Sequence, residues 1–125
     1  MLDMGICTRG LKNRIVNGIE LYSVSSVATD IYQREAHQQK DLTNEELELK
    51  LTALALSAKK VGEVSDIKDM YQFGGFFMTI NKRTRKIETV HWSHDNHHSK
   101  INQFQIELLK ENYLKLGLTV NGNVA

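Results

Sequence analysis

Two short segments of the chain hold side chains whose types and spacing could do chemistry, and both lie between residues 74 and 98. In the first, the strand-like runs FFMTI and IETVHW are joined by a turn that carries four cations: Lys82, Arg83, Arg85 and Lys86. Cations at the tip of a β-hairpin can reach phosphate oxygens or a carboxylate-rich surface. The turn therefore predicts an anion-binding site, although a solvated turn that discourages edge pairing has the same composition.

A second group of cations lies near the N-terminus and consists of Arg9, Lys12 and Arg14. The net charge of the chain is only +1, so any electrostatic attraction has to come from such local clusters. We expect this group to act together with the hairpin tip on one anionic partner. Phosphate contact needs lysine and arginine without a spacing rule, which leaves nucleic acid, a nucleotide ligand and an acidic protein surface open as partners.

The second segment, residues 91–98, contains four of the five histidines of the chain. His94 and His98 have the spacing that places two imidazoles on one helical face, where they can share a zinc ion. His91 or Asp95 could supply a third ligand, but Asp95 stands where an HExxH motif has its catalytic glutamate. Zinc or another divalent metal here would indicate a metal-assisted phosphoesterase or nuclease; the other interpretation is a polar loop without metal.

Other signatures of enzymes are absent from the sequence, which has no GxGxxG, P-loop, GxSxG or CxxC motif and a single cysteine, Cys7. No run approaches the roughly 20 apolar residues of a membrane span, and the N-terminus does not resemble a secretory signal. We therefore expect a cytoplasmic, non-enzymatic binding or regulatory protein that needs no cofactor and does not bind a membrane. The metal-assisted enzyme is the alternative.

Turn and capping residues predict the elements that position these segments. Asn17-Gly18 suits a type I′ turn in a first hairpin, and a serine N-cap at position 25 or 26 precedes a helix over 26–39. Thr43 and Glu46 form a capping box for a helix over 44–60, which Gly62 ends. A short helix follows over 65–72, then the cationic hairpin, then a helix from Ser99, or less favourably Ser93, to Gly117.

These elements predict one α+β domain over residues 1–125 in the order β-β-α-α-(short α)-β-β-α, with a flexible tail over 118–125. The two hairpins are expected to form one antiparallel sheet with two or three helices packed on it. A winged-helix arrangement is the alternative, in which the short helix precedes the cationic hairpin as a wing.

Pairing of Ile80 with Ile87 would place one set of side chains of the second hairpin on its core side, because side chains alternate along a strand. That set contains Phe76, Met78, Ile80, Ile87, Thr89 and His91.

The helix over 44–60 is apolar on two sides. Leu47, Leu51 and Leu54 lie on one side, and Leu49, Ala53 and Leu56 lie roughly opposite. Either other elements of the chain cover both sides, or a second subunit covers one of them. We expect a homo-oligomer, so a protein-interaction module is a third functional hypothesis.

Overall fold

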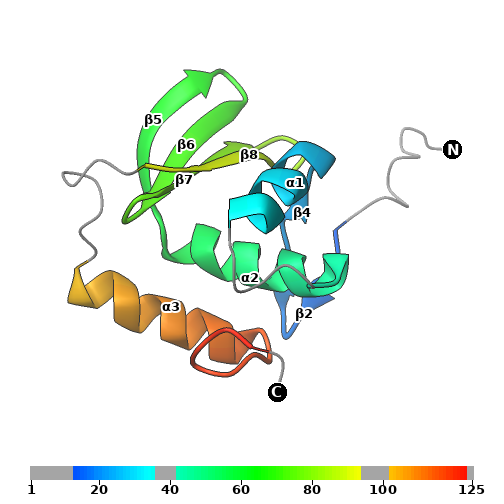
Figure 1. Ribbon diagram of the computed structural model, residues 1–125, viewed down its shortest axis with the longest axis vertical. Helices are drawn as coiled ribbons and strands as arrows, with labels where there is room; N and C mark the ends of the chain where they lie inside the picture. The colour runs from blue at the N-terminus through cyan, green and yellow to red at the C-terminus, as the bar shows by residue number, and fades with distance from the viewer. Residues whose placement is uncertain (1–12, 36–41, 94–101, 124–125) are drawn as a thin grey trace, which may run out of the picture.

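The computed structural model describes residues 13–35, 42–93 and 102–123. Within these ranges the protein is α+β, as predicted, with three helices and two sheets (Figure 1). In chain order, the elements are β2 (Ile15–Val16), β3 (Ile19–Glu20), β4 (Ser23–Val24), α1 (Ser26–Glu35), α2 (Asn44–Ser57), β5 (Lys59–Ser65), β6 (Lys68–Phe73), β7 (Phe76–Asn81), β8 (Lys86–Trp92) and α3 (Gln103–Lys115).

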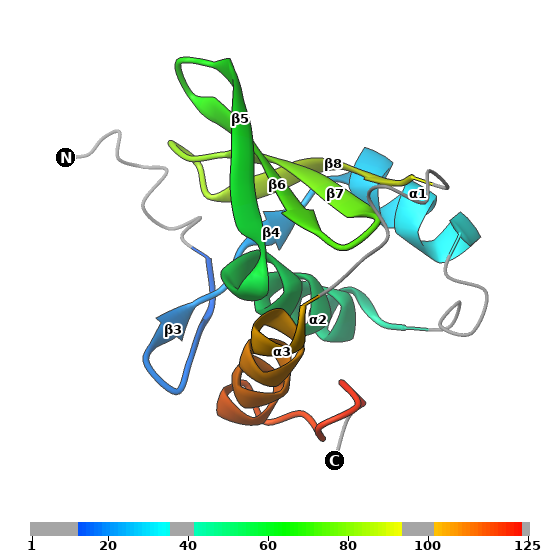
Figure 2. The same ribbon diagram turned by 90° about the vertical axis from the view of Figure 1, so that its left-hand side faces the viewer.

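The larger sheet has the strand order β4-β8-β7-β6-β5, and the described helices lie on one side of it (Figure 2). The first hairpin, β2–β3, turns at Asn17 and Gly18, whose φ angles of 52° and 81° confirm the predicted left-handed turn. The prediction that both hairpins join in one sheet is wrong. Instead β4, which follows the first hairpin, pairs with β8 in parallel, so among the described residues before α1 only β4 is a strand of the large sheet.

The hairpin β5–β6 replaces the predicted end of the second helix and the predicted short helix over 65–72. Ala58 is already extended, and Gly62 lies inside β5 rather than at a helix end. The β-branched Val61 and Val64 suit a strand, and β7 pairs with the whole of β6, so sheet formation outweighs the helical spacing of this segment. The winged-helix alternative required that short helix, so the structure does not support it.

A β-bulge shifts the register of the second hairpin. Ile80 pairs with Ile87 as predicted, but Thr79 pairs with Thr89, which leaves Glu88 as the extra residue. The prediction that Thr89 and His91 face the core is therefore wrong, because every residue beyond the bulge is turned to the other side. The core-facing residues of β8 are Ile87, Val90 and Trp92, while Thr89 and His91 are exposed.

Two apolar clusters lie on opposite sides of α2. Leu47 and Leu51 pack with α1 and the inner face of the sheet, whereas Ala53 and Leu49 pack against α3. The second cluster also contains Leu21, Tyr113, Leu116 and Leu118. Both apolar sides of α2 are thus covered within one chain.

Local caps fix the helix ends. The capping box of Thr43 and Glu46 is present. Helix α3 begins after an Asn102 N-cap rather than at Ser99, since the Asn102 side chain accepts the Gln105 N–H at 2.8 Å. Gly117, with φ of 84°, follows its last turn as predicted, and the Leu118 N–H closes a Schellman motif on the Tyr113 carbonyl.

Residues 118–123, for which the sequence predicts a flexible tail, fold back on α3. Leu118 is buried, and the Gly122 N–H donates to the Thr119 carbonyl at 2.8 Å. An added Cβ on Gly122 would lie 2.7 Å from the Tyr113 ring. The backbone of the tail thus lies directly on an aromatic face.

Candidate functional site

The cationic turn between β7 and β8 is held in one conformation by Asn81. The Asn81 Oδ1 accepts the backbone N–H groups of Arg83 and Thr84 at 3.0 and 3.1 Å, and its Nδ2 donates to Glu88 at 3.1 Å. The Lys82 N–H donates to the Ile67 carbonyl at 2.8 Å, which attaches the turn to the neighbouring β5–β6 turn. The backbone that carries the cations is therefore fixed by hydrogen bonds on its own hairpin and on the next one.

Glu88, the bulge residue, supports the base of this turn. Its carboxylate accepts a 2.8 Å ion pair from Lys68 and the hydrogen bond from Asn81. These two donors, Lys68 first, lower the pKa of the Glu88 carboxyl. Glu88 therefore stays ionised beside the turn, and its negative charge is already paired with the ammonium group of Lys68.

Arg85 points back into the protein rather than outward. Its Nε and Nη2 donate to the Glu20 carbonyl at 3.1 and 2.9 Å, and its guanidinium lies 4.1 Å from the centre of the Tyr22 ring. Burial raises the pKa of the Tyr22 hydroxyl, and the nearby Arg85 opposes that shift. The Arg85 carbonyl, from a residue with φ of 54°, accepts hydrogen bonds from Ser23 and Asn13. Arg85 thus joins the turn to the first hairpin and to β4.

Lys82 forms an ion pair with the buried carboxylate of Asp69, which was not among the site residues predicted from the sequence. Asp69 is 3% exposed, and its two oxygens lie 3.5 Å from the Lys82 Nζ and 3.6 Å from the Lys60 Nζ. The pairing depends on β6, which the sequence predicted as helix, so no local pattern could have identified it. Lys82 keeps a half-exposed side chain despite this contact.

Arg83 and Lys86 are exposed, and neither side chain forms an ion pair or a hydrogen bond with a described residue. Of the four predicted cations, Arg83, Lys86 and the half-exposed Lys82 therefore present charge outward. Arg85 is the one that shapes the turn.

Arg14, the one described residue of the N-terminal cationic group, is bound at α2 rather than at the turn. Arg14 pairs with Glu48 at 3.2 Å and with the Glu45 carboxylate at 3.8 Å, at the start of α2. Its Nη2 also donates to the Glu45 carbonyl at 3.1 Å. Arg9 and Lys12 lie outside the described residues.

Of the predicted metal ligands, His94, Asp95 and His98 lie outside the described residues. His91 lies on the outer face of the sheet, with its ring 5.3 Å from that of Phe77. Within the described ranges, no three histidine, cysteine or acidic side chains are grouped so that they could hold a metal ion.

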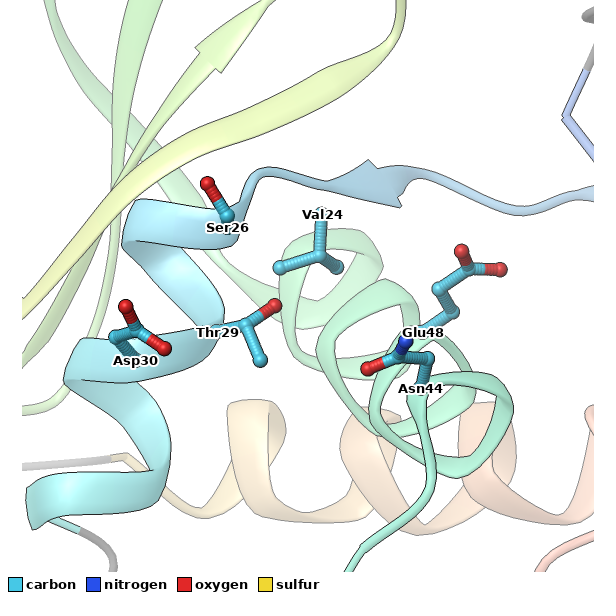
Figure 3. A pocket seen from close by; sticks show the side chains of 6 residues that line it. All are labelled: Val24, Ser26, Thr29, Asp30, Asn44 and Glu48. Carbon is cyan, nitrogen blue, oxygen red and sulfur yellow. The ribbon is translucent and has the colours of Figure 1, made fainter.

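A polar cavity of about 270 Å³ lies between the first turns of α1 and α2 (Figure 3). Thr29 on α1 and Asn44 on α2 face each other across it, and Asp30 and Glu48 add two carboxylates. No cation lines this cavity, so it does not suit a phosphate-bearing ligand.

None of the described helices is long and apolar enough to span a membrane. No protein-family model, curated protein or solved structure matches the chain. Function therefore has to be inferred from the chain's own geometry.

Proposed function

We propose that this protein is a non-enzymatic nucleic-acid-binding protein that contacts phosphates through Lys82, Arg83 and Lys86. The observation that carries the proposal is the fixed turn: three outward cations stand on a backbone held by hydrogen bonds to Asn81, Ile67 and Ser23. Because this backbone is already ordered, binding would have to immobilise only the side chains.

An extended polyanion fits this site better than a free nucleotide. The cations lie on the turn between β7 and β8, whereas the cavity between α1 and α2 has no cation in its lining and contains the carboxylate of Asp30, which repels phosphate. A strand of nucleic acid needs only successive phosphates within reach of the turn and no hollow.

The test is the salt dependence of binding to a fluorescent oligonucleotide, measured by anisotropy. Three phosphate contacts predict that log K falls with log salt with a slope of about −2 for a single strand. The triple variant Lys82→Gln, Arg83→Gln, Lys86→Gln should bind at least tenfold more weakly at low salt and lose most of this slope. Its melting temperature should fall modestly, because Arg83 and Lys86 are exposed, whereas Lys82 also pairs with the buried Asp69, which keeps Lys60 as its remaining cation.

The matched control is Arg34→Gln, Lys110→Gln, Lys115→Gln, which removes the same charge from α1 and α3. It should bind like the wild type. Equal losses in both triple variants would show that overall charge, not the turn, drives binding. Absence of wild-type binding at low salt would remove nucleic acid as the partner and leave an acidic protein surface.

A further inference from the structure

The outer face of the large sheet carries an aromatic pair on its two central strands. Phe77 on β7 lies directly opposite His91 on β8, and their ring centres are 5.3 Å apart. Phe76 and Met78, the neighbours of Phe77, are buried on the other face against α1 and α2. Among the described helices, none lies on the outer face (Figure 2).

The same face leads along both strands to the cationic turn. Beyond the aromatic pair come the pair Thr79 and Thr89, then the pair Asn81 and Lys86. The four residue steps from Phe77 to Asn81 span about 13 Å, a distance that a few nucleotides of extended single strand can bridge. Glu88 lies between the two ends, but its charge is matched by Lys68 at 2.8 Å.

We propose that this outer face binds single-stranded nucleic acid, with bases stacked at Phe77 and His91 and the adjoining phosphates held by Lys86 and Arg83. The inference rests on the proposed phosphate contact and adds a preference for single strands. Every base has a π-face, so aromatic platforms on a sheet bind unpaired bases with little sequence preference. Bases inside a duplex are stacked on one another and cannot reach such a platform.

A cross-strand aromatic pair can also act only as a stabiliser of the sheet. The two roles differ in what Phe77→Leu changes. Leucine keeps an apolar side chain on the strand but removes the π-face, so a stacking role predicts a loss of single-strand affinity that is separate from any change in melting temperature.

The experiment compares an oligothymidine of about 12 nucleotides, within the site size of small single-strand binders, with a duplex of the same length. The wild type should bind the oligothymidine about tenfold more tightly than the duplex. Phe77→Leu should weaken single-strand binding by about five- to tenfold and leave duplex binding unchanged. His91→Thr, at an exposed strand position, provides a second variant if Phe77→Leu does not fold.

The matched control is Phe104→Leu on α3, where the phenylalanine is 73% exposed and remote from the turn. It should bind as the wild type does. The stacking inference would be overturned if the wild type bound both oligonucleotides with equal affinity, or if neither Phe77→Leu nor His91→Thr weakened single-strand binding. Binding that still depended on the turn cations would then support the proposed function alone. No binding to either oligonucleotide would overturn both.

Discussion

Lys50 combines a charged side chain with a position inside the protein. It lies on α2, is 3% exposed, and forms no ion pair or hydrogen bond with any described residue. Burial lowers the pKa of its ammonium group, and Glu46, one turn earlier on the helix, opposes the shift. A buried cation without a partner costs stability unless it loses its proton.

The sign of the pH effect follows from that lowered pKa. Between the folded pKa and the ordinary value of 10.5, the unfolded chain binds more protons at this site, so stability rises as pH rises through this window. Lys50→Met keeps the length of the side chain and removes the charge. We expect it to stabilise the protein by about 1 to 3 kcal/mol at pH 7.

Urea unfolding at pH 7 and at pH 10 checks this prediction, because the gain in the free energy of unfolding from Lys50→Met should be smaller at the higher pH. The exposed Lys115→Met on α3 serves as the control and should show neither effect. A less stable Lys50→Met at pH 7 would mean that the ammonium group has a favourable partner.

At the scale of single residues, the sequence predicts which side chains are charged but not what they contact. Arg83 and Arg85 look alike in the turn, yet Arg85 bonds to a carbonyl 65 positions away along the chain. Such a contact depends on how β4 and the first hairpin pack beside β8. The sequence therefore identified the cationic turn and missed that one of its four cations is structural.

At the scale of elements, short-range chemistry was predicted well. The Asn17-Gly18 turn, the Thr43 capping box and the glycine after α3 each depend on neighbouring residues only, and all three are confirmed. The hairpin β5–β6 was missed because its stability comes from pairing with β7. The bulge at Glu88 likewise has no local pattern, so the outer-face position of His91 could not be predicted.

Residues 118–123 provide a test of whether this segment is held against α3. Gly122 has φ of 81° and lies against the Tyr113 ring, whereas Gly62 in β5 has open space where a Cβ would be. Gly122→Ala should therefore lower the stability by about 1 kcal/mol or more, through the unfavourable φ and the clash. Gly62→Ala, the matched control, should change it by less than about 0.5 kcal/mol, as expected away from strained or crowded positions.

Thermal unfolding of the two variants measures the difference. If Gly122→Ala melts like the wild type, residues 118–123 do not hold their packed position in solution, and the tail predicted from the sequence is the better description.

At the scale of the whole molecule, α2 organises the described structure. The sheet and α1 cover its Leu47 and Leu51 side, and α3 covers its Ala53 side. Between α2 and α3, Asn112 donates to the Ser57 hydroxyl at 2.9 Å, and Ser57 donates to the Ala53 carbonyl at 2.7 Å. The homo-oligomer was predicted because α2 is apolar on two sides. Helix α3 of the same chain covers the side that a second subunit was expected to cover, so this argument for an oligomer no longer holds.

Leu49 distinguishes the two arrangements by experiment. It packs against the cluster of Tyr113 and Leu116, so Leu49→Glu should place a carboxylate between α2 and α3 and destabilise the folded chain itself. We expect a loss of about 2 kcal/mol or more in urea unfolding, with no change in the mass measured by light scattering at micromolar concentration. Leu114→Glu, at a position that is 55% exposed on α3, is the matched control and should leave both values unchanged. A wild-type dimer that Leu49→Glu converts into a stable monomer would instead place a second subunit on this side of α2, because only an intermolecular contact can be lost without unfolding the chain.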